Sequence, residues 1–344
     1  MEAQTIRSTD TERLRNKKIR AAAAFIIMAV LLLLLIFLSA NIGSLKVGAG
    51  QMFRGLFIEY DNDVSTIFDL RFPRIFISVL AGAAFAVAGV LFQAVLKNPL
   101  ADPGIIGISS GAGFAAVIIS SFVPALYFLS PLFAFAGGIV AFLLVYSLSW
   151  KGGLSPLRII LVGVAVDAMF TGLASAVNSM SGGNLTGVAS IIEGNISQKT
   201  WDDFHTLLPY VLIGLVLSFM MANSCNLLSL EDKTARGLGI NVTRRRIIIS
   251  VVGVLLAAIS TAVVGTISFL GLIVPHIGRI LVGSDHKALI PFCMLFGGFL
   301  FLLADTIGRT IAYPYEVTAS VVMAIIGGPF FIILLRGSKK YGNA

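Results

Sequence analysis

The chain has 344 residues, of which 57% are hydrophobic and 12% are charged. Soluble domains carry about 25% charged residues, so this composition excludes an ordinary soluble protein and predicts a polytopic membrane protein with room for roughly ten spans. The net charge of +8 would suit nucleic acid, but the basic residues are distributed as in a membrane protein, as shown below. The two cysteines, Cys225 and Cys293, lie in apolar runs and indicate neither a disulfide framework nor a metal site.

The chain begins with a basic segment followed by a long apolar run. Residues 1–20 carry six Lys and Arg, and residues 21–40 carry no charge. The run is too long for the hydrophobic region of a signal peptide, and many more apolar runs follow. We therefore predict that it is the first span, with the basic segment on the inner side of the membrane.

Apolar runs separated by polar segments continue to the end of the chain. The predicted spans lie at 21–40, at 75–96, twice between 104 and 150, at 159–179, at 207–227, from 247, at 271–283, at 288–308 and at 317–335. Residues 41–74 and 180–206 are predicted outer loops, the second with a short helix near 188–192. Gly82 and Gly89 in the second span suit close helix packing.

The eighth run is short and is interrupted by Gly271 and Pro275. If it spans the membrane, 19 of the 25 Lys and Arg lie on the inner side together with both termini, which satisfies the positive-inside rule. If it does not, the basic C-terminus lies outside. We therefore predict an all-α polytopic membrane protein with ten transmembrane helices. Its expected divisions are a cytoplasmic N-terminal segment 1–20, a permease domain 21–336 that includes a cytoplasmic loop 228–243, and a cytoplasmic tail 337–344.

The loop 228–243 is a mixed-charge island between two apolar runs. Ser229 and Asp232 have the spacing of a capping box, which predicts the start of a short helix. Asp232 and Arg236 are four residues apart and can support each other on one face. Gly237 suits the left-handed residue that ends such a helix.

Three residues of the island recur at helical spacing. Leu230, Thr234 and Leu238 follow at i, i+4 and i+8, which is the layout of a short helix offered to a groove on a partner. The spacing fits equally well a solvated loop helix that has no partner.

Several kinds of chemistry are not indicated by the sequence. There is no Gly-Lys dipeptide, hence no phosphate-binding loop with which the chain would hydrolyse ATP itself. His205, His276 and His286 have no second ligand at helical spacing, so no metal site is predicted. We expect neither an enzyme nor a bound cofactor.

Two carboxylates lie inside predicted spans, where charged groups are costly and call for a reason. Asp305 lies four residues before Arg309, so a local ion pair explains it. Asp167 has no partner in its own helix. It either faces a pore or is a buried acid hydrogen-bonded to a neighbouring helix.

Several stretches together resemble the permease subunits of ABC importers for iron–siderophores, haem and cobalamin. The order and spacing of the matching residues make the resemblance specific over residues 70–335. The matching stretches are Leu70–Arg74, Gln93 with Asn98–Gly104, Gly107–Gly113, Leu230–Gly239, Gly265–His276, Arg279, Ser284–His286, Leu303–Asp305, Arg309, Pro314–Glu316 and Gly327–Phe330.

The resemblance implies a type II ABC importer fold, similar to the cobalamin permease, and a set of partners. These are a second permease subunit, identical or related, two ATP-binding subunits and an extracytoplasmic substrate-binding protein. Arg71, Arg74 and Arg309 match arginines that dock the binding protein, and Asn98 and Leu100 match a cytoplasmic gate. The residues implied in coupling to the ATPase are Leu230, Glu231, Asp232, Thr234, Ala235, Arg236, Gly237, Leu238 and Gly239.

Some positions depart from the pattern of this family. Ser155-Pro-Leu157 replaces small hydroxyl residues at the other gate position, so no gate role is assigned there. Thr318 stands where proline is common. Asp167 stands where a small residue is usual, which suggests a role specific to this substrate or partner.

We expect a permease of the bacterial cytoplasmic membrane that carries an iron chelate, with a ferric siderophore as the expected cargo. Haem and cobalamin uptake by the same mechanism remain alternatives. A secondary transporter coupled to protons or sodium is the competing class, but it would carry more coupling carboxylates near the midplane. A channel is disfavoured because no charged filter is visible.

Overall fold

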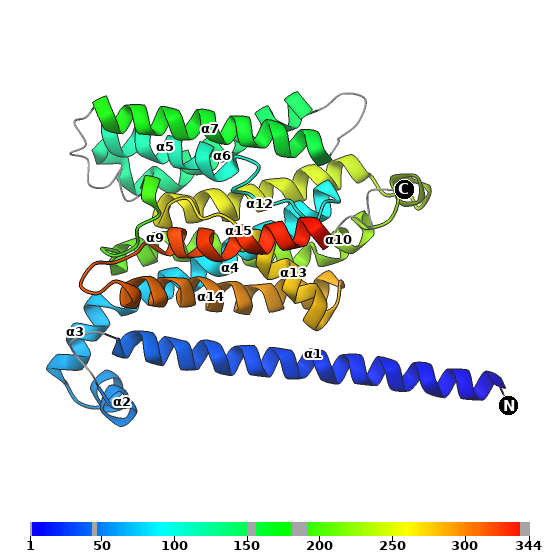
Figure 1. The fold of residues 1–344 in the computed structure, drawn as a ribbon, viewed down its shortest axis with the longest axis horizontal. Helices are drawn as coiled ribbons and strands as arrows, with labels where there is room; N and C mark the ends of the chain where they lie inside the picture. Colours follow the sequence, from blue (N-terminus) through cyan, green and yellow to red (C-terminus); the bar gives the residue numbers. More distant parts are fainter. Residues whose placement is uncertain (1, 43–46, 150–155, 181–190, 338–344) are drawn as a thin grey trace.

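The computed structural model describes residues 2–42, 47–149, 156–180 and 191–337, and within these ranges every element is helical (Figure 1). The long helices run side by side along one axis. The helices are α1 (Glu2–Asn41), α2 (Ala49–Phe57), α3 (Asn62–Leu70), α4 (Phe72–Leu96), α5 (Ile108–Phe122), η1 (Pro124–Leu129), α6 (Ser130–Ser149), α7 (Pro156–Met180), α9 (Trp201–Met220), α10 (Ala222–Leu228), α11 (Asp232–Gly237), α12 (Val242–Val264), α13 (Leu270–Val282), α14 (His286–Ile311) and α15 (Ala319–Gly337).

Seven of the described helical segments are long and apolar enough to cross a membrane. They contain α1, α4, α6, α7, α9, α12 and α14. Three further apolar helices are shorter, within residues 108–122, 270–282 and 319–334. These ten elements coincide with the ten predicted runs, and α13 matches the short eighth run.

Helix α4 forms the centre of the bundle. It packs against α14, α12, α13 and α9, and 83% of the residues in its most apolar stretch are buried. By contrast, only 22–28% of the residues in the most apolar stretches of α6, α7 and α9 are buried. Since many large hydrophobic side chains of these outer helices are exposed, their outer faces suit lipid or another apolar partner.

Glycines allow the central helices to approach closely. Gly82 on α4 lies against Gly297 on α14, and a Cβ at either position would collide with the backbone of the other. Gly89 lies in the same way against the carbonyl of Gly271 at the start of α13. The predicted role of Gly82 and Gly89 in close packing is therefore confirmed.

Two helices begin in the interior of the bundle after irregular backbone. Helix α13 follows the non-helical residues 265–269 and starts after Phe269, whose φ is 69°. Helix α5 starts after Gly107, whose φ is 78°. Non-helical backbone at membrane depth must be buried in protein, and Gly107 packs against α7 while Phe269 packs against Gly327 on α15. The eighth run is short, as predicted, but Gly271 and Pro275 do not interrupt it: α13 is continuous over Leu270–Val282, and the irregular backbone lies just before it.

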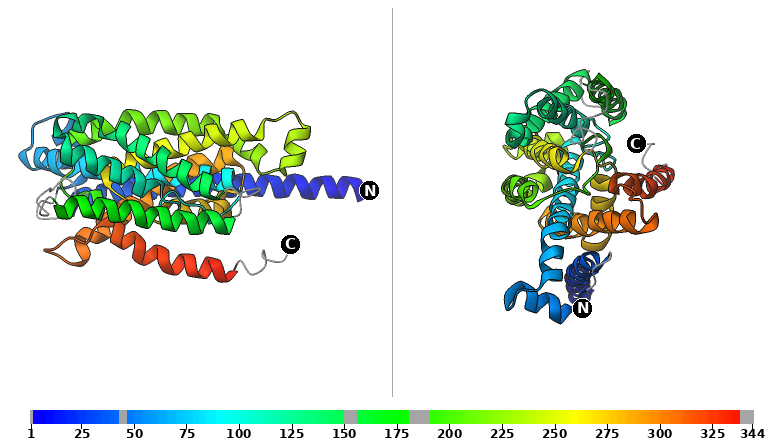
Figure 2. Two further views of the ribbon diagram at one scale, coloured as in Figure 1. Left: turned by 90° about the horizontal axis from the view of Figure 1, so that it is seen from above. Right: turned by 90° about the vertical axis from the view of Figure 1, so that its left-hand side faces the viewer.

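The bundle has two distinct ends (Figures 1 and 2). Helix α1 starts and α15 ends at one of them, which also holds the end of α4 and is called here the α11 end. Helices α2 and α3 lie at the opposite end, called here the arginine end; they fold within what was predicted only as an outer loop. The helix predicted near 188–192 falls largely outside the described residues, of which 191–193 are helical.

Candidate functional sites at the two ends of the bundle

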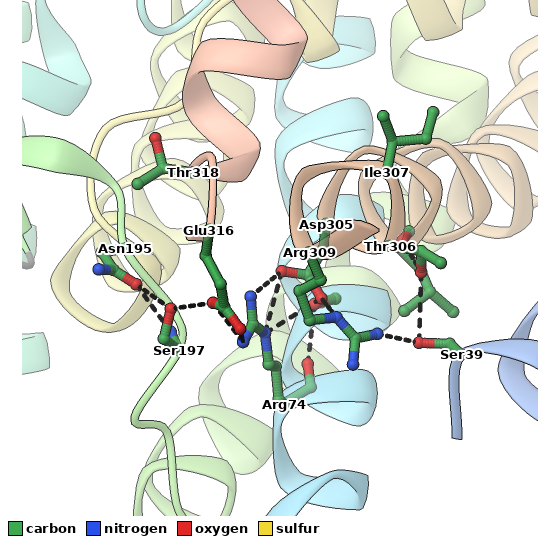
Figure 3. A network of polar contacts seen from close by, with 12 residues as sticks. Ser39, Arg74, Asn195, Ser197, Asp305, Thr306, Ile307, Arg309, Glu316 and Thr318 are labelled. Carbon is green, nitrogen blue, oxygen red and sulfur yellow. Dashed lines mark hydrogen bonds and ion pairs between the residues drawn. The ribbon is translucent and has the colours of Figure 1, made fainter. Parts of the chain in front are cut away.

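The arginine end contains a buried ion cluster (Figure 3). Arg74, in the first turn of α4, is 7% exposed and donates to Asp305 on α14 from Nη2 at 2.8 Å and from Nε at 3.0 Å. Its Nη1 donates to Glu316, in the connection between α14 and α15, at 2.9 Å. Both ends of this guanidinium are therefore occupied by carboxylates of the same chain.

Further residues extend the ion cluster to other elements. Arg309 lies 3.3 Å from the Asp305 carboxylate and also donates to the Ser39 hydroxyl at the end of α1. The Ser197 hydroxyl, ahead of α9, donates to Glu316 at 2.6 Å. We call Arg74, Asp305, Arg309, Glu316, Ser39 and Ser197 the arginine cluster. It joins α1, α4 and α14 to the segment before α9, through Ser197, and to the connection between α14 and α15, through Glu316.

The electrostatics of the arginine cluster are balanced, with two guanidinium groups facing two carboxylates. Asp305 is 1% exposed, so its charge depends on its arginine partners because an isolated buried carboxylate is strongly disfavoured. The Glu316 side chain is 40% exposed. Its partial burial raises its pKa, but the Ser197 hydrogen bond and Arg74 lower that pKa further, so the net shift is downward and Glu316 stays ionised.

The predicted local ion pair between Asp305 and Arg309 is present, but it is one part of a larger network. The third predicted docking residue, Arg71, precedes α4 and donates to the Ala40 carbonyl at 2.6 Å. It lies at the same end as Arg74 and Arg309. The three arginines are thus brought together, with Arg74 the most deeply enclosed.

At the α11 end, the mixed-charge island forms the six-residue helix α11. Leu230 and Leu238 are 37% and 64% exposed, so part of the predicted apolar stripe faces outward. Asp232 accepts from Lys97 at 2.8 Å and from Arg246 at 3.0 Å. The hydrogen bond from Lys97 is the largest cause of a lowered Asp232 pKa. This carboxylate therefore connects α11 to the end of α4 and the start of α12.

Two details of the predicted α11 geometry are wrong. Ser229 is not its cap: its hydroxyl donates to the Asn226 carbonyl at 2.6 Å, and the position before α11 is Glu231, which makes no side-chain cap. Asp232 forms its ion pairs with Lys97 and Arg246, outside α11, and the predicted support from Arg236 is present as a smaller electrostatic contribution to the lowered Asp232 pKa.

The second wrong detail concerns the glycine that ends α11. Gly237 is the last residue of the helix and lacks a positive φ, whereas Gly239 has a φ of 76°. The helix closes with the Gly239 amide donating to the Arg236 carbonyl at 2.9 Å. The chain turns left-handed two residues later than predicted, at the position where glycine has no steric penalty.

The predicted gate residues form a tight turn directly after α4. The side chain of Asn98 accepts from the Leu100 amide at 3.0 Å, and its carbonyl accepts from the Ala101 amide at 3.1 Å. Gln93 on α4 donates to the Ala101 carbonyl at 3.3 Å and to the Gly271 carbonyl at 3.1 Å. The turn is thereby held to α4 and to the start of α13.

Asp167 lies on α7 and is half-buried. It interacts with Ser110 in the first turn of α5, and its backbone packs against Gly107. It forms no ion pair with the described residues. A carboxylate beside a helix N-terminus is favoured by the helix dipole, which gives Asp167 a structural explanation.

Sequence reasoning missed two polar residues that the fold uses. Asp102 is 1% exposed and accepts from the amides of Gly104 and Ile105 at 2.8 and 3.2 Å, an Asx turn that its Asp-Pro-Gly sequence could have suggested. Lys97 joins α4 to α11, which no local pattern reveals. Among the described residues, no three His, Cys, Asp or Glu gather in a group able to hold a metal.

These features define a class: an all-helical membrane transport protein with a buried core helix, broken helices and charged clusters at both ends. Comparison with known proteins gives the family. The FecCD transport family model matches residues 31–337, and the chain belongs to this family of ABC importer permeases. The resemblance noted in the sequence is confirmed.

Individual relatives and solved structures agree with this family. The chain is 38% identical over 304 residues to "Probable heme-iron transport system permease protein IsdF" of Staphylococcus aureus strain Newman, covering 88% of this chain and 92% of that protein. The same permease of strain MW2 is 37% identical over an equal length.

Two solved structures share the fold. One, from a metal-chelate type ABC transporter in an inward-facing conformation, has a TM-score of 0.76 and 27% identity over 92% of this chain and 99% of that chain. The other, PsaBC from Streptococcus pneumoniae in complex with Fab, has a TM-score of 0.54 and 20% identity over 83% of this chain and 95% of that chain. The second supports the fold alone.

Proposed function

We propose that this chain is the membrane-spanning permease subunit of an ABC importer that takes up an iron chelate across the bacterial cytoplasmic membrane. The observation that carries the proposal is the match over 88% of the chain to a permease named for heme-iron transport, within the FecCD family. ATP hydrolysis belongs to partner subunits, because the sequence lacks a phosphate-binding loop.

The chemical class of the cargo is an iron complex. The sequence alone led us to expect a ferric siderophore, whereas the relative IsdF is named for heme-iron. Heme is therefore the first cargo to test, and ferric siderophores are the second. Both are large iron-containing chelates that a binding protein would deliver to the outer face.

The experiment is uptake into proteoliposomes that contain the permease with its ATPase and the cognate binding protein. Iron-labelled heme and ferric siderophores are offered separately, with ATP or a non-hydrolysable analogue inside. ATP-dependent uptake of one chelate supports the proposal and selects the cargo. Uptake by the permease alone, driven by a proton or sodium gradient, would instead establish a secondary transporter.

The proposed topology is ten transmembrane helices with both termini in the cytoplasm. This proposal is supported by the start of α1 and the end of α15, which lie at the same end of the bundle, as an even number of crossings would place them (Figure 1). Seven long apolar helices and three shorter ones supply ten. The proposed divisions are the N-terminal segment 1–20, the permease domain 21–336 and the tail 337–344. Labelling of single cysteines placed at the two ends would test the orientation.

The proposed assembly has two permease subunits, identical or related, two ATPase subunits and one binding protein. The largely exposed apolar faces of α6, α7 and α9 leave area for lipid and for a second permease. Within loop 228–243, α11 is the proposed ATPase contact, supported by the outward-facing Leu230 and Leu238.

At the opposite end, the proposed docking face for the binding protein contains Arg71, Arg74 and Arg309. Positive charge near the helix mouths supports this, although Arg74 and Arg309 are also bound within the arginine cluster. Asn98 and Leu100 are the proposed cytoplasmic gate, in the turn at the α11 end.

A further inference from the structure

One lysine connects the proposed ATPase contact to the proposed gate. The Lys97 ammonium donates to the Leu230 carbonyl, just ahead of α11, and to the Asp232 carboxylate inside α11 at 2.8 Å. Lys97 is also the residue that ends α4, and the peptide bond after it leads into Asn98. A single residue therefore contacts α11 with its side chain and the gate turn with its backbone.

The groups that Lys97 connects are also bound by other residues of the chain. On the α11 side, Asp232 is also held by Arg246 on α12 at 3.0 Å, so α11 is fixed by cations from two helices. On the gate side, the Asn98 amide donates to the Gln93 carbonyl at 3.2 Å and the Asn98 side chain closes on the Leu100 amide at 3.0 Å. A displacement of Lys97 is thus passed on to the turn.

The backbone of Lys97 supports a specific role for its side chain. Its φ of 50° and ψ of 36° lie in the left-handed region, which glycine or asparagine adopts more readily than lysine. A glycine would end α4 with less strain. The lysine at this position supplies something that the backbone alone does not need, and the observed contacts with α11 identify it.

The gate turn is also hydrogen-bonded, through Gln93, to helix α13. Gln93 joins the Ala101 carbonyl to the Gly271 carbonyl at the start of α13, and Arg279 on α13 donates to the Gln93 side-chain oxygen at 2.6 Å. The gate turn and α13 are therefore both hydrogen-bonded to the Gln93 side chain.

We propose that Lys97 is the positioning residue that transmits movement of α11 to the gate turn Asn98–Ala101. This inference rests on the proposed function, in which α11 receives the motion of the ATPase. The Lys97 side chain acts as a short strut: when α11 shifts, the ammonium follows Asp232 and the Leu230 carbonyl, and the end of α4 moves with it. Loss of the ammonium leaves both elements folded but uncoupled.

The test measures gate movement directly and does not depend on the cargo. Leu100→Cys is labelled with a membrane-impermeant maleimide in the permease–ATPase complex, with and without ATP and vanadate. The native Cys225 and Cys293 are fully buried and do not compete. We expect the labelling rate to change on ATP binding, and Lys97→Met to reduce that change at least fivefold. Lys97→Arg keeps the two acceptors within reach and should retain most of it.

The matched control is Lys287→Met. Lys287 is an exposed lysine near the same end, and its side chain forms no ion pair with the described residues. It should leave the ATP-dependent change in Leu100→Cys labelling as it is. Co-purification of the ATPase with each variant shows whether assembly is intact.

Three results would overturn the proposal. If Lys97→Met loses the ATPase, Lys97 supports docking rather than transmission, and if its labelling still responds fully to ATP, the gate moves by another route. A wild-type complex whose labelling ignores ATP would also refute the relay. By contrast, ATP-dependent labelling that Lys97→Met suppresses, in a complex that moves no iron chelate, would refute the cargo and leave the relay standing.

Discussion

Arg74 and Asp305 form a buried ion pair between α4 and α14, although they are 231 residues apart in the chain. Their side chains are 9% and 1% exposed, and the guanidinium donates from two nitrogens to the carboxylate. Two such groups depend on each other, because a buried charge that loses its partner has no water to replace it. The pair therefore holds the two central helices in register at the arginine end.

Arg74→Met should destabilise the permease by about 3 kcal/mol, because it leaves Asp305 with only Arg309 as a counter-charge. Thermal unfolding of the purified complex in detergent measures the loss. Arg54→Met is the matched control, since Arg54 on α2 is exposed and forms no ion pair with the described residues. Equal melting temperatures for the two variants would show that the buried pair contributes nothing.

The sequence predicted the helices well because hydropathy is a local property. Each apolar run became a helix near its expected position, including the short α13. The same reasoning paired Asp305 with Arg309 because only neighbours at helical spacing are visible in a sequence. Arg74 and Glu316 approach Asp305 and each other through the packing of α4 and α14, which no local pattern encodes.

The errors at α11 have a similar cause. The sequence predicted the left-handed residue at Gly237, whereas its actual position, Gly239, depends on where the helix starts. Lys97 and Arg246 hold Asp232 at the first position of α11, and the helix starts there rather than near Ser229. Contacts from outside the segment therefore decided its boundaries.

Gly239→Ala should impair transport, whereas Gly237→Ala should be tolerated. A Cβ at either position would meet no neighbouring atom, so the two variants differ only in backbone conformation. Gly239 has a φ of 76°, where a Cβ costs about 1 kcal/mol. Gly239→Asn should recover much of the activity because asparagine adopts this conformation more readily. The measurement is ATP-dependent uptake per permease–ATPase complex. Equal uptake by Gly237→Ala and Gly239→Ala would contradict the assignment of the turn to Gly239.

Gly89→Ala should disrupt the junction of α4 with α13. The added methyl group would collide with the Gly271 carbonyl, which also accepts the Gln93 side chain. Overpacking of this kind costs about 1–3 kcal/mol. Gly172→Ala on α7 is the control, because nothing lies within 4 Å of a Cβ there. The measurements are the monodispersity and the melting temperature of the two variants. A Gly89→Ala protein that matches Gly172→Ala in both would rule out the tight contact.

Asp167→Asn should fold and transport nearly as the wild type does. The amide keeps a polar contact with Ser110, and the interaction of a formal charge with the start of α5 is worth no more than about 1 kcal/mol. Asp167→Leu removes the polar contact as well and should lower the melting temperature. If Asp167→Asn assembles normally but loses transport, Asp167 acts on the substrate path instead.

Charge changes at the arginine end should alter binding-protein association in opposite directions. An acidic docking surface would be attracted by Arg71 and repelled by Glu316, whose side chain is 40% exposed. Arg71→Glu should therefore weaken association and Glu316→Gln should strengthen it, each by about 2–10-fold at low ionic strength, because charges at an interface rim act mainly on the association rate. Arg71 is preferable to Arg74 for this test, since reversal of the buried Arg74 would also damage the fold.

The dependence of binding-protein association on salt and pH tests the docking face further. Salt shortens the screening length from about 10 Å at 0.1 M to about 3 Å at 1 M. The effects of Arg71→Glu and Glu316→Gln on association should therefore both become smaller as the salt concentration rises. Burial raises the pKa of Glu316, but Ser197 and Arg74 lower it more, so its charge persists as the pH falls towards the ordinary value of 4.5. The effect of Glu316→Gln should thus be equal at pH 6 and pH 8. Unchanged association in both variants at low salt would mean that Arg71 anchors the helix mouth and does not dock a partner.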